Sequence, residues 1–454
     1  MDNLAAAVLA AGKGTRIKSS VPKVLHKVCG KEMIRYVVDS LNLAGIDRVV
    51  VVVSPSDHDA INTVLGDSVK YAIQEAQLGT GDALMSAQRA LGTANNIVVV
   101  NGDLPAIRTS TLNAQIQHHI EQSADLTLLA AQIERPDGEG RLVLRQNDGR
   151  PDRVVEEVDA DQDILGIKTV NVGVYCFQST WLWPNLSKIR PAGEGERYLP
   201  ELVQIASTNG DLTASFCLQD PSEAVGVNNR VQLAAAESVL QNRIREEWML
   251  DGVTMPDPAT VYIDSVAKLQ PDTTIKPNTH VTGSTTIGRG SVIGPNSMIH
   301  NSQIGIHCTV LASIIEESTL EDQVSVGPYS HVRAGTYLET DVHIGNYVEI
   351  KASRLGRGTK SGHFSYIGDA EIGRDVNIGA GTITANYDGK KKLRTIIDDG
   401  AFIGSDSVLV APVSVGNSAS TGAGAVVTKD VPPNTRVAGV PAKPMLKGKE
   451  EKGN

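Results

Sequence analysis

Hydrophobic and polar positions alternate in two different ways along the chain, and the pattern changes near residue 250. In the first half, apolar runs such as Val49–Val53 and Ile97–Val100 predict strands that are buried on both faces. The helical composition of Gly81–Leu91 and Ser110–Glu121 predicts helices between such strands. Residues 1–229 are therefore expected to form a Rossmann-like α/β domain on a mostly parallel sheet, with helices on both faces.

A helical segment follows this domain. Asn228–Leu250 has neither Gly nor Pro and is rich in strong helix formers, and Asp251-Gly252 followed by Pro256 ends it. We expect a linker helix over residues 230–250 and a second domain over residues 251–454.

In this second domain, aliphatic residues recur every six positions. The repeat falls at Ile275, Val281, Ile287, Ile293 and Ile299, at Leu320, Val326, Val332, Leu338, Ile344 and Ile350, at Ile372 and Ile378, and at Ile403, Leu409, Val415, Thr421 and Val427. Such hexads predict an all-β domain, a parallel β-helix in which each aliphatic residue points inward. Thr384–Gly400 interrupts the rhythm with three consecutive lysines. It is expected to be an insertion, either a solvated loop or a carrier of binding groups.

Composition narrows the class of protein. The 454 residues carry a formal charge of −10, which argues against nucleic acid as the main partner, and 41% of them are hydrophobic, which indicates a globular chain. The four cysteines are far apart and form no C-x-x-C pair, as expected in a reducing cytoplasm; they are Cys29, Cys176, Cys217 and Cys308. No apolar run reaches about 18 residues, so we expect no membrane insertion. The apolar Leu4–Ala11 could be a signal peptide, but the preceding Asp2 and the lack of Lys or Arg there favour a first strand.

Two strand ends carry candidate chemistry. After the first strand, Leu9–Arg16 reads L-A-A-G-K-G-T-R, which fits neither G-x-G-x-x-G nor a P-loop. Its backbone N–H groups could still hold an anion, with Arg16 and Lys23 adding positive charge; the alternative is an ordinary turn. After a later strand, Asp103 in N-G-D-L-P could hold Mg²⁺ against phosphate oxygens, or could simply form the turn.

Together these motifs resemble a known family. L-A-A-G-x-G-T-R, P-K-x-L, Q-L-G-T-G and G-D-x-P are similar to sugar-1-phosphate nucleotidyltransferases. N-Y-V-E-I-K, S-G-H-F-S-Y-I-G-D-A, N-I-G-A-G-T-I-T-A-N-Y-D-G and F-I-G-S, which lie between Asn346 and Ser405, narrow the resemblance. Over essentially the whole chain it is to the bifunctional N-acetylglucosamine-1-phosphate uridylyltransferase/glucosamine-1-phosphate acetyltransferases.

The resemblance implies a left-handed β-helix, assembly into a homotrimer through it, and small-molecule substrates that include UTP and acetyl-CoA, with Mg²⁺ as cofactor. It implies that UDP-N-acetylglucosamine is made for cell-envelope glycans. In the first domain, the implied nucleotide and sugar contacts are Leu9, Ala10, Ala11, Gly12, Arg16, Lys23, Gln74, Gly79, Thr80, Asn101, Gly102, Asp103, Gly140, Glu156, Asn171 and Asn228. Asp103 and Asn228 would hold the metal.

In the second domain, the resemblance implies that His363 is the catalytic base, since imidazole titrates in the range that acyl transfer to an amine needs. The implied sugar-phosphate contacts are Arg333, Lys351, Tyr366 and Asn377, and the implied acetyl-CoA contacts are Ala380, Asn386, Tyr387, Ser405 and Ala423. Lys392 in the insertion could reach coenzyme phosphates on a neighbouring subunit.

Four positions depart from the family pattern. Asp82 stands in place of His, Asn101 and Glu139 in place of Tyr, and Gly439 in place of an Arg for which Lys443 or Lys447 could substitute. Two alternatives to a bifunctional enzyme remain open at this point. One is a single-activity nucleotidyltransferase with a structural β-helix, and the other is a non-enzymatic scaffold subunit.

Overall fold

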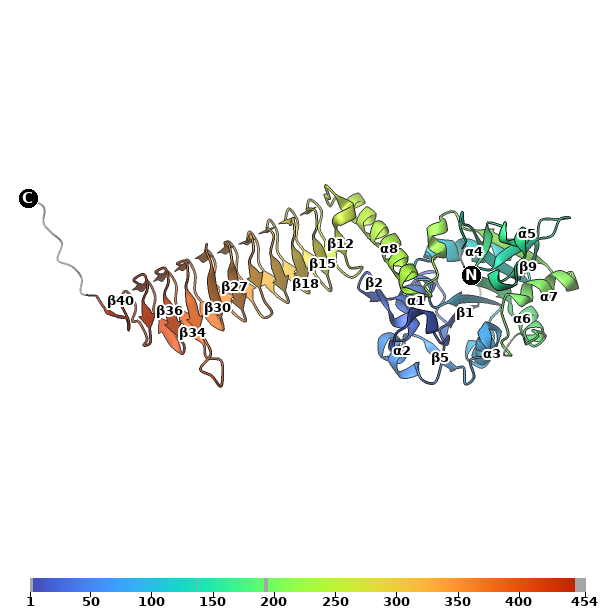
Figure 1. The fold of residues 1–454 in the computed structure, drawn as a ribbon, viewed down its shortest axis with the longest axis horizontal. Coiled ribbons are helices and arrows are strands. Elements are labelled where there is room, and N and C mark those ends of the chain that lie inside the picture. Colours follow the sequence, from blue (N-terminus) through green and yellow to red (C-terminus); the bar gives the residue numbers. More distant parts are fainter. Residues whose placement is uncertain (1–2, 137, 192–194, 446–454) are drawn as a thin grey trace, which may run out of the picture. The chain divides into compact units, whose positions relative to one another are not determined.

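The computed structural model describes residues 3–136, 138–191 and 195–445, and the chain divides into two compact units, Met1–Leu240 and Gln241–Asn454 (Figure 1). The division falls inside helix α8 (Arg230–Leu250), the segment for which the sequence predicts a helix. None of the described helices is long and apolar enough to cross a bilayer.

The first unit is built on one nine-stranded sheet with the strand order β11-β7-β10-β6-β1-β4-β5 and a side branch of β8 and β9 on β10. The strands are β1 (Leu4–Leu9), β4 (Val49–Val53), β5 (Lys70–Ile73), β6 (Asn96–Asn101), β7 (Leu126–Gln132), β8 (Arg141–Leu144), β9 (Pro151–Val155), β10 (Thr169–Gln178) and β11 (Thr213–Cys217). The part β6-β1-β4-β5 is parallel, as the apolar runs predict. Because β10 runs antiparallel to both β6 and β7, the sheet as a whole is mixed. A separate small hairpin joins β2 (Lys27–Val28) to β3 (Lys31–Glu32).

Helices cover both faces of this sheet, which explains why its central strands are apolar throughout. One face packs against α1 (Met33–Leu43), α2 (His58–Leu65) and α4 (Thr109–Glu121), and the other against α3 (Gly79–Leu91), α6 (Ser179–Leu186) and α7 (Glu201–Asn209). A further short helix, α5, spans Gln162–Leu165. The five valines of β4 point alternately into the two cores. Parallel strands end at a common edge, so the turns after β1, β5 and β6 meet there.

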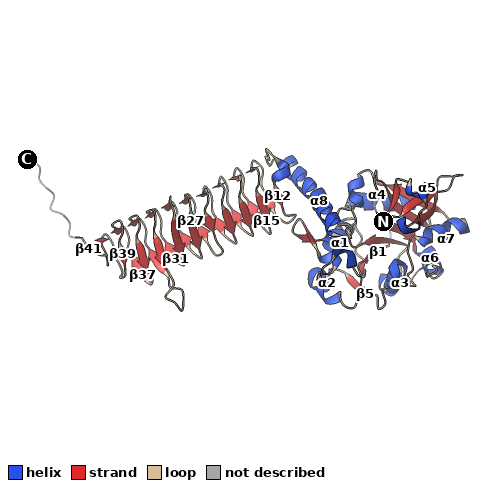
Figure 2. Cartoon of the chain, in the orientation of Figure 1, coloured by secondary structure: helices blue, strands red, loops and turns tan. Residues whose placement is uncertain are grey.

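The second unit is a prism of three sheets whose strands from β12 to β39 are parallel, with every third strand in the same sheet (Figure 2). At the C-terminal end, β40 follows β38 in its sheet and β41 pairs antiparallel with β40. Sheet E contains β12 (Tyr262–Ile263), β15 (His280–Thr282), β18 (Met298–His300), β21 (Ile314–Glu316), β24 (His331–Val332), β27 (Val348–Lys351), β30 (Ser365–Gly368), β33 (Ile383–Ala385), β36 (Val408–Val410) and β39 (Val426–Val427). Sheet F contains β13 (Lys268–Leu269), β16 (Thr286–Ile287), β19 (Gln303–Ile304), β22 (Thr319–Leu320), β25 (Tyr337–Leu338), β28 (Arg354–Leu355), β31 (Ala370–Ile372), β34 (Thr395–Ile397) and β37 (Val413–Val415). Sheet D contains β14 (Thr274–Ile275), β17 (Val292–Ile293), β20 (Thr309–Val310), β23 (Ser325–Val326), β26 (His343–Ile344), β29 (Lys360–Ser361), β32 (Asn377–Ile378), β35 (Phe402–Ile403), β38 (Ser420–Thr421), β40 (Arg436–Ala438) and β41 (Lys443–Pro444).

The hexad residues form the core of this prism. Every position of the predicted repeat is buried, and equivalent residues pair from coil to coil, as Val332 does with Ile350. The hexapeptide β-helix predicted from the six-residue period is thus confirmed.

The predicted insertion is shorter than expected. Thr384 and Ile397 are buried inward positions of β33 and β34, so only residues 386–394 leave the stack. Thr384 fits the core because its hydroxyl oxygen accepts a hydrogen bond from Gly368 N at 2.8 Å, which satisfies the polar group.

Candidate functional site

A cavity of about 780 Å³ opens at the carboxyl edge of the first sheet. It is lined by nearly all of the residues predicted for this unit, namely Leu9, Ala10, Ala11, Gly12, Arg16, Lys23, Gln74, Gly79, Thr80, Asn101, Asp103, Gly140, Glu156, Asn171 and Asn228. Gly102 lies beneath the lining, where its N–H donates to Leu9 O at 2.9 Å. A Cβ at Gly102 would approach the same carbonyl oxygen to 3.2 Å, which accounts for the glycine.

Positive charge and oxygen ligands meet at one side of this cavity. The Lys23 ammonium forms a short ion pair with Asp103 and donates to Asn228 Oδ1 at 3.0 Å. Arg16 donates to the same Asn228 oxygen at 3.0 Å, and the backbone of Val227 is tied to Asp103 O. Among the described residues, no group of three or more His, Cys, Asp or Glu side chains could hold a metal ion. Any ion here would therefore rely on one carboxylate and one amide.

The turn after β5 forms a second wall. Gln74 is buried, and its side-chain amide donates to Gly79 O and to Asp82 Oδ2. Gly79 has a φ of +91°, and a Cβ there would lie 2.5 Å from Arg197 O. Only glycine therefore fits without displacing the backbone around Arg197. The Thr80 hydroxyl accepts from Leu199 N at 2.9 Å and closes this wall.

The third wall surrounds Glu156. Burial, and secondarily the charge of Asp159, raises the pKa of the Glu156 carboxyl. Next to it, Asn171 N donates to Gly140 O, and the Asn171 side chain donates to the Tyr175 hydroxyl at 2.7 Å. The Asn171 amide and the Tyr175 hydroxyl suit the hydroxyl and amide groups of a sugar.

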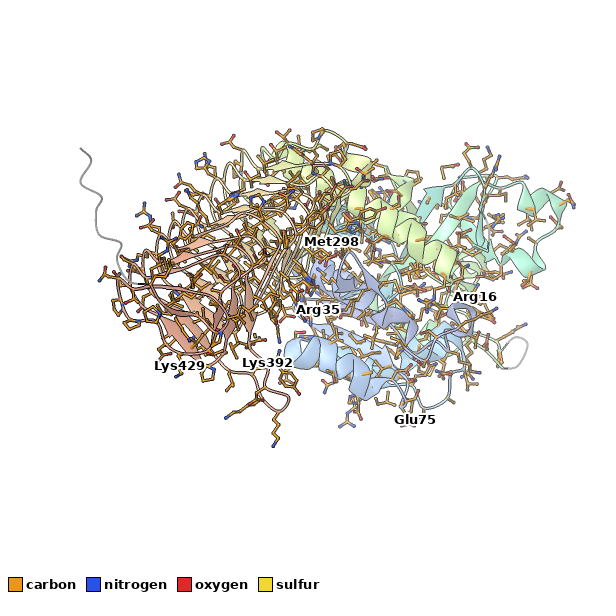
Figure 3. The ribbon with its side chains drawn as sticks, turned by 60° about the vertical axis from the view of Figure 1, so that its left-hand side comes forward. Arg16, Arg35, Glu75, Met298, Lys392 and Lys429 are labelled. Atoms are coloured by element: carbon orange, nitrogen blue, oxygen red, sulfur yellow. The ribbon has the colours of Figure 1, made fainter. Side chains whose placement is uncertain are left out.

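In the β-helix, charged residues gather where sheet E meets sheet F. Arg333 donates to Glu349 Oε1 at 2.6 Å, and the Lys351 ammonium faces that of Lys392. This like charge lowers the pKa of Lys351. Lys392 thus lies beside a lysine of its own chain, at the base of the loop (Figure 3). Such a cluster of cations suits a phosphate group.

Asn386 and Tyr366 border these cations. The Asn386 amide donates to Asp369 Oδ2 at 2.5 Å and more weakly to the Tyr366 hydroxyl at 3.4 Å. Tyr366 pairs in register with Glu349 of the preceding coil, so the two side chains share one face of sheet E.

The remaining predicted residues lie at a different corner, where sheet D meets sheet E. The exposed His363 stands there, and Ala380, Ser405 and Ala423 occupy equivalent positions in the coils that follow. Asn377 lies on neighbouring β32 and is also exposed. Within one chain, the predicted base and the cationic cluster are therefore at opposite edges of sheet E. Tyr387 is exposed in the loop.

The position expected to hold an Arg is Gly439, whose φ of +93° favours glycine. Lys443 is exposed in β41, and Lys447 lies outside the described residues.

Some residues that line the cavity of the first unit were not predicted from the sequence. Gln77 donates to Ala11 O at 2.6 Å, and its place within Q-L-G-T-G could have indicated it. Tyr175 and Tyr198 also line the cavity, but neither stands in a recognisable motif.

Comparison with known proteins extends over both units. Residues 6–208 match the family described as the MobA-like NTP transferase domain, and residues 267–301 match the bacterial transferase hexapeptide repeats. The "Bifunctional protein GlmU" of Halalkalibacterium halodurans is 44% identical over 434 residues, which is 95% of each chain. The protein of the same name from Heliobacterium modesticaldum is 46% identical over 95% of this chain and 94% of its own. That from Exiguobacterium sibiricum is 44% identical over 94% of this chain and 96% of its own.

Proposed function

Because this chain belongs to the GlmU family of bifunctional proteins, we propose that its two units divide the two steps of UDP-N-acetylglucosamine synthesis between them. The chain is an acetyltransferase and a uridylyltransferase, which sets aside the single-activity and scaffold alternatives. In our proposal the β-helix acetylates glucosamine-1-phosphate with acetyl-CoA. The first unit then transfers uridylyl from UTP to the product. The observation that carries this division is that the first unit has an open cavity lined by Arg16 and Lys23, whereas the second unit has a cationic cluster around Arg333 and Lys351.

In the first unit, the phosphate oxygen of N-acetylglucosamine-1-phosphate attacks the α-phosphorus of UTP and pyrophosphate leaves. Arg16 and Lys23 neutralise the charge that builds up on the phosphates, while the turn after β1 offers backbone N–H groups. Glu156 and Asn171 face the sugar, and Gln74, Gly79 and Thr80 face the base. Positioning and charge neutralisation are the main sources of rate in such transfers.

Mg²⁺ fits the donor set at Asp103 and Asn228. Their side-chain oxygens already converge on one cation, the Lys23 ammonium, and hard oxygen donors are what Mg²⁺ prefers. When bound, the ion supplies further positive charge at the phosphate oxygens. Lys23 must then turn from Asp103 towards the substrate, which frees the carboxylate.

In the β-helix, His363 takes the proton from the glucosamine nitrogen that attacks the thioester carbonyl, and coenzyme A leaves. Because His363 lies at the opposite edge of sheet E from Arg333 and Lys351, we propose that these two cations come from a neighbouring copy of the chain and hold the sugar phosphate, while Tyr366 and Asn377 contact the sugar. The coenzyme lies along Ala380, Ser405 and Ala423, with the backbone of Asn386 and Tyr387 as candidate donors to the oxyanion.

We further propose that copies of the chain assemble as a homotrimer along the corner between sheets D and E, where His363 lies. The exposed rings of Tyr329 and Tyr347 stack there at 5.4 Å, and the exposed Phe364 follows in the next coil. A second copy packed on these rings would cover apolar surface and could bring its own groups to His363. We propose the cytoplasm as the place of action, which the thiols of Cys176, Cys217 and Cys308 support.

Product analysis tests the division of labour. Wild-type protein is supplied with glucosamine-1-phosphate, acetyl-CoA, UTP and Mg²⁺, and products are identified by mass spectrometry. We expect His363→Ala to stop acetylation while added N-acetylglucosamine-1-phosphate is still uridylylated. We expect Asp103→Ala to give the reverse pattern. Loss of both activities in either variant, with the fold intact, would contradict the proposal.

A further inference from the structure

We infer that Asp82 is a positioning residue that fixes the side-chain amide of Gln74 and thereby makes the uridylyl site selective for uracil over cytosine. This inference rests on the proposed function of the cavity. It concerns the position at which this sequence departs from the expected motif after G-T-G.

The hydrogen bonds of Gln74 determine which way its amide faces. Gln74 follows β5, its backbone N–H is tied to Val53 O at 2.9 Å, and its side chain is only 3% exposed. Its Nε2 lies 3.1 Å from Gly79 O and 2.9 Å from Asp82 Oδ2. A carbonyl and a carboxylate can only accept, so both amide hydrogens must point towards them.

The amide oxygen is consequently left for the cavity. No described residue donates a hydrogen bond to Gln74 Oε1. This oxygen is also not one of the fully buried side-chain atoms without a partner, so it is accessible from the cavity. Because Gln74 lines the cavity and is otherwise buried, a ligand there is the natural donor to this oxygen. The site therefore presents a fixed acceptor to the base.

The supports of this acceptor are themselves fixed. Asp82 lies in the first turn of α3, where the helix dipole favours a negative charge. Gly79 is held against the backbone of Arg197, because Gly81 N donates to Arg197 O at 2.8 Å. Gln74 thus has two acceptors in place before any nucleotide binds, and the amide does not need to reorganise.

A fixed acceptor distinguishes the two pyrimidines. The ring nitrogen N3 carries a hydrogen in uracil and a lone pair in cytosine, so uracil donates to Gln74 Oε1 whereas cytosine would place two acceptors face to face. Sites built to use a hydrogen bond reject the partner that cannot make it. Without the Asp82 carboxylate, only Gly79 O would hold the Gln74 amide, so the orientation of the amide would be less strongly fixed.

The test compares UTP with CTP in pyrophosphate release with N-acetylglucosamine-1-phosphate and Mg²⁺. For Asp82→Asn and Asp82→Ala we expect kcat/KM for UTP to fall by about tenfold, mainly through KM, which is the worth of one hydrogen bond. The preference for UTP over CTP should shrink by a similar factor. Asp59→Asn is the matched control, because Asp59 lies in the first turn of α2 with a fully exposed side chain and should keep the wild-type preference.

Acetyl transfer by the same preparations reports only that the β-helix is folded, so the unfolding transition of the first unit, followed by circular dichroism, must show that this unit is folded as well. If Asp82 variants do not fold, Gln74→Met removes the acceptor with Asp82 in place and should reduce the preference equally. A preference unchanged in these variants, with wild-type activity present, would overturn the inference alone. Failure of wild-type protein to release pyrophosphate from UTP would instead overturn the proposed function.

Discussion

The proposed sugar-phosphate contacts Arg333 and Lys351 are expected to depend on the buried Ile350 of sheet E, and Ile350→Ala tests this dependence. Ile350 is completely buried in β27, where it separates Glu349 from Lys351. Its carbonyl accepts from Arg333 N at 2.8 Å, and it pairs with Val332 and Ile367 in the adjacent coils. Truncation would leave a cavity directly beneath the cationic cluster.

The expected cost follows from the buried side chain. The change removes about three carbon groups, worth ~0.8 kcal/mol each in transfer free energy. The unfilled cavity adds to this, so the free energy of unfolding of the β-helix should fall by about 3 to 4 kcal/mol. Because each coil contacts only its neighbours, the effect should be confined to the second unit.

The assay follows both activities of one preparation during urea unfolding and heating. Acetyl transfer should be lost at lower urea and lower temperature than in the wild type, while uridylyl transfer keeps its wild-type midpoint. The matched control is Ile299→Ala, since Ile299 is equally buried in the same sheet but flanked by Met298 and His300, away from the cluster.

Both variants should be destabilised to a similar extent. Only Ile350→Ala should also raise KM for glucosamine-1-phosphate under conditions where the β-helix is fully folded. Equal KM values in the two variants would refute the idea that this core residue positions Glu349 and Lys351.

Three further outcomes are expected. Burial lowers the pKa of His119 from 6.5 to about 4, so its contribution is present above pH 6.5 and is lost as pH falls towards 4. That loss amounts to roughly 3 kcal/mol of unfolding free energy. The unfolding free energy of His119→Gln, measured in urea, should therefore depend less on pH than that of the wild type. An equal dependence on pH in the two proteins would contradict this prediction. Since the pKa of Glu156 is raised, its charged form destabilises the folded unit at neutral pH. In calorimetry at pH 7, Glu156→Gln should therefore have a higher melting temperature than the wild type, and its melting temperature should rise less as pH falls, although it should bind sugar phosphate more weakly. An unchanged melting temperature would contradict this prediction. Chelation by EDTA should stop pyrophosphate release and spare acetyl transfer, whereas continued release would exclude the metal site at Asp103.

The β-helix could be predicted from the six-residue repeat, and most of the cavity lining from the glycine-rich motifs, each for a physical reason. Most inward positions of the β-helix are Ile, Val or Leu, so positions such as Ile350 are visible at a fixed period. Thr384 escaped because a hydroxyl can also occupy that position when it accepts a hydrogen bond from Gly368 N. The glycine-rich turns that line the cavity are recognisable because glycine is needed where backbone approaches backbone, as at Gly79.

Other features could not be predicted because they depend on contacts that are remote in sequence. The antiparallel course of β10 leaves no local signature, since buried parallel and antiparallel strands share the same apolar composition. Tyr198 reaches the cavity through the contact of its neighbour Leu199 with Thr80, more than a hundred positions away in the chain. The separation of His363 from Lys351 across sheet E is likewise a matter of which corner each residue occupies.

The coil-to-coil ladder of the β-helix also sets the terms on which this chain can change its length. Paired positions such as Val281 and Ile299 are one coil apart, and each coil adds a single strand spacing of about 4.8 Å to the axis. Removing a whole coil before β24 would leave every pairing around Arg333 and Lys351 in register. Removing any fraction of a coil would instead turn these residues onto a different face of the prism. Length in this domain is therefore quantised, and insertions and deletions between related chains should be found in whole coils or in corner loops such as 386–394.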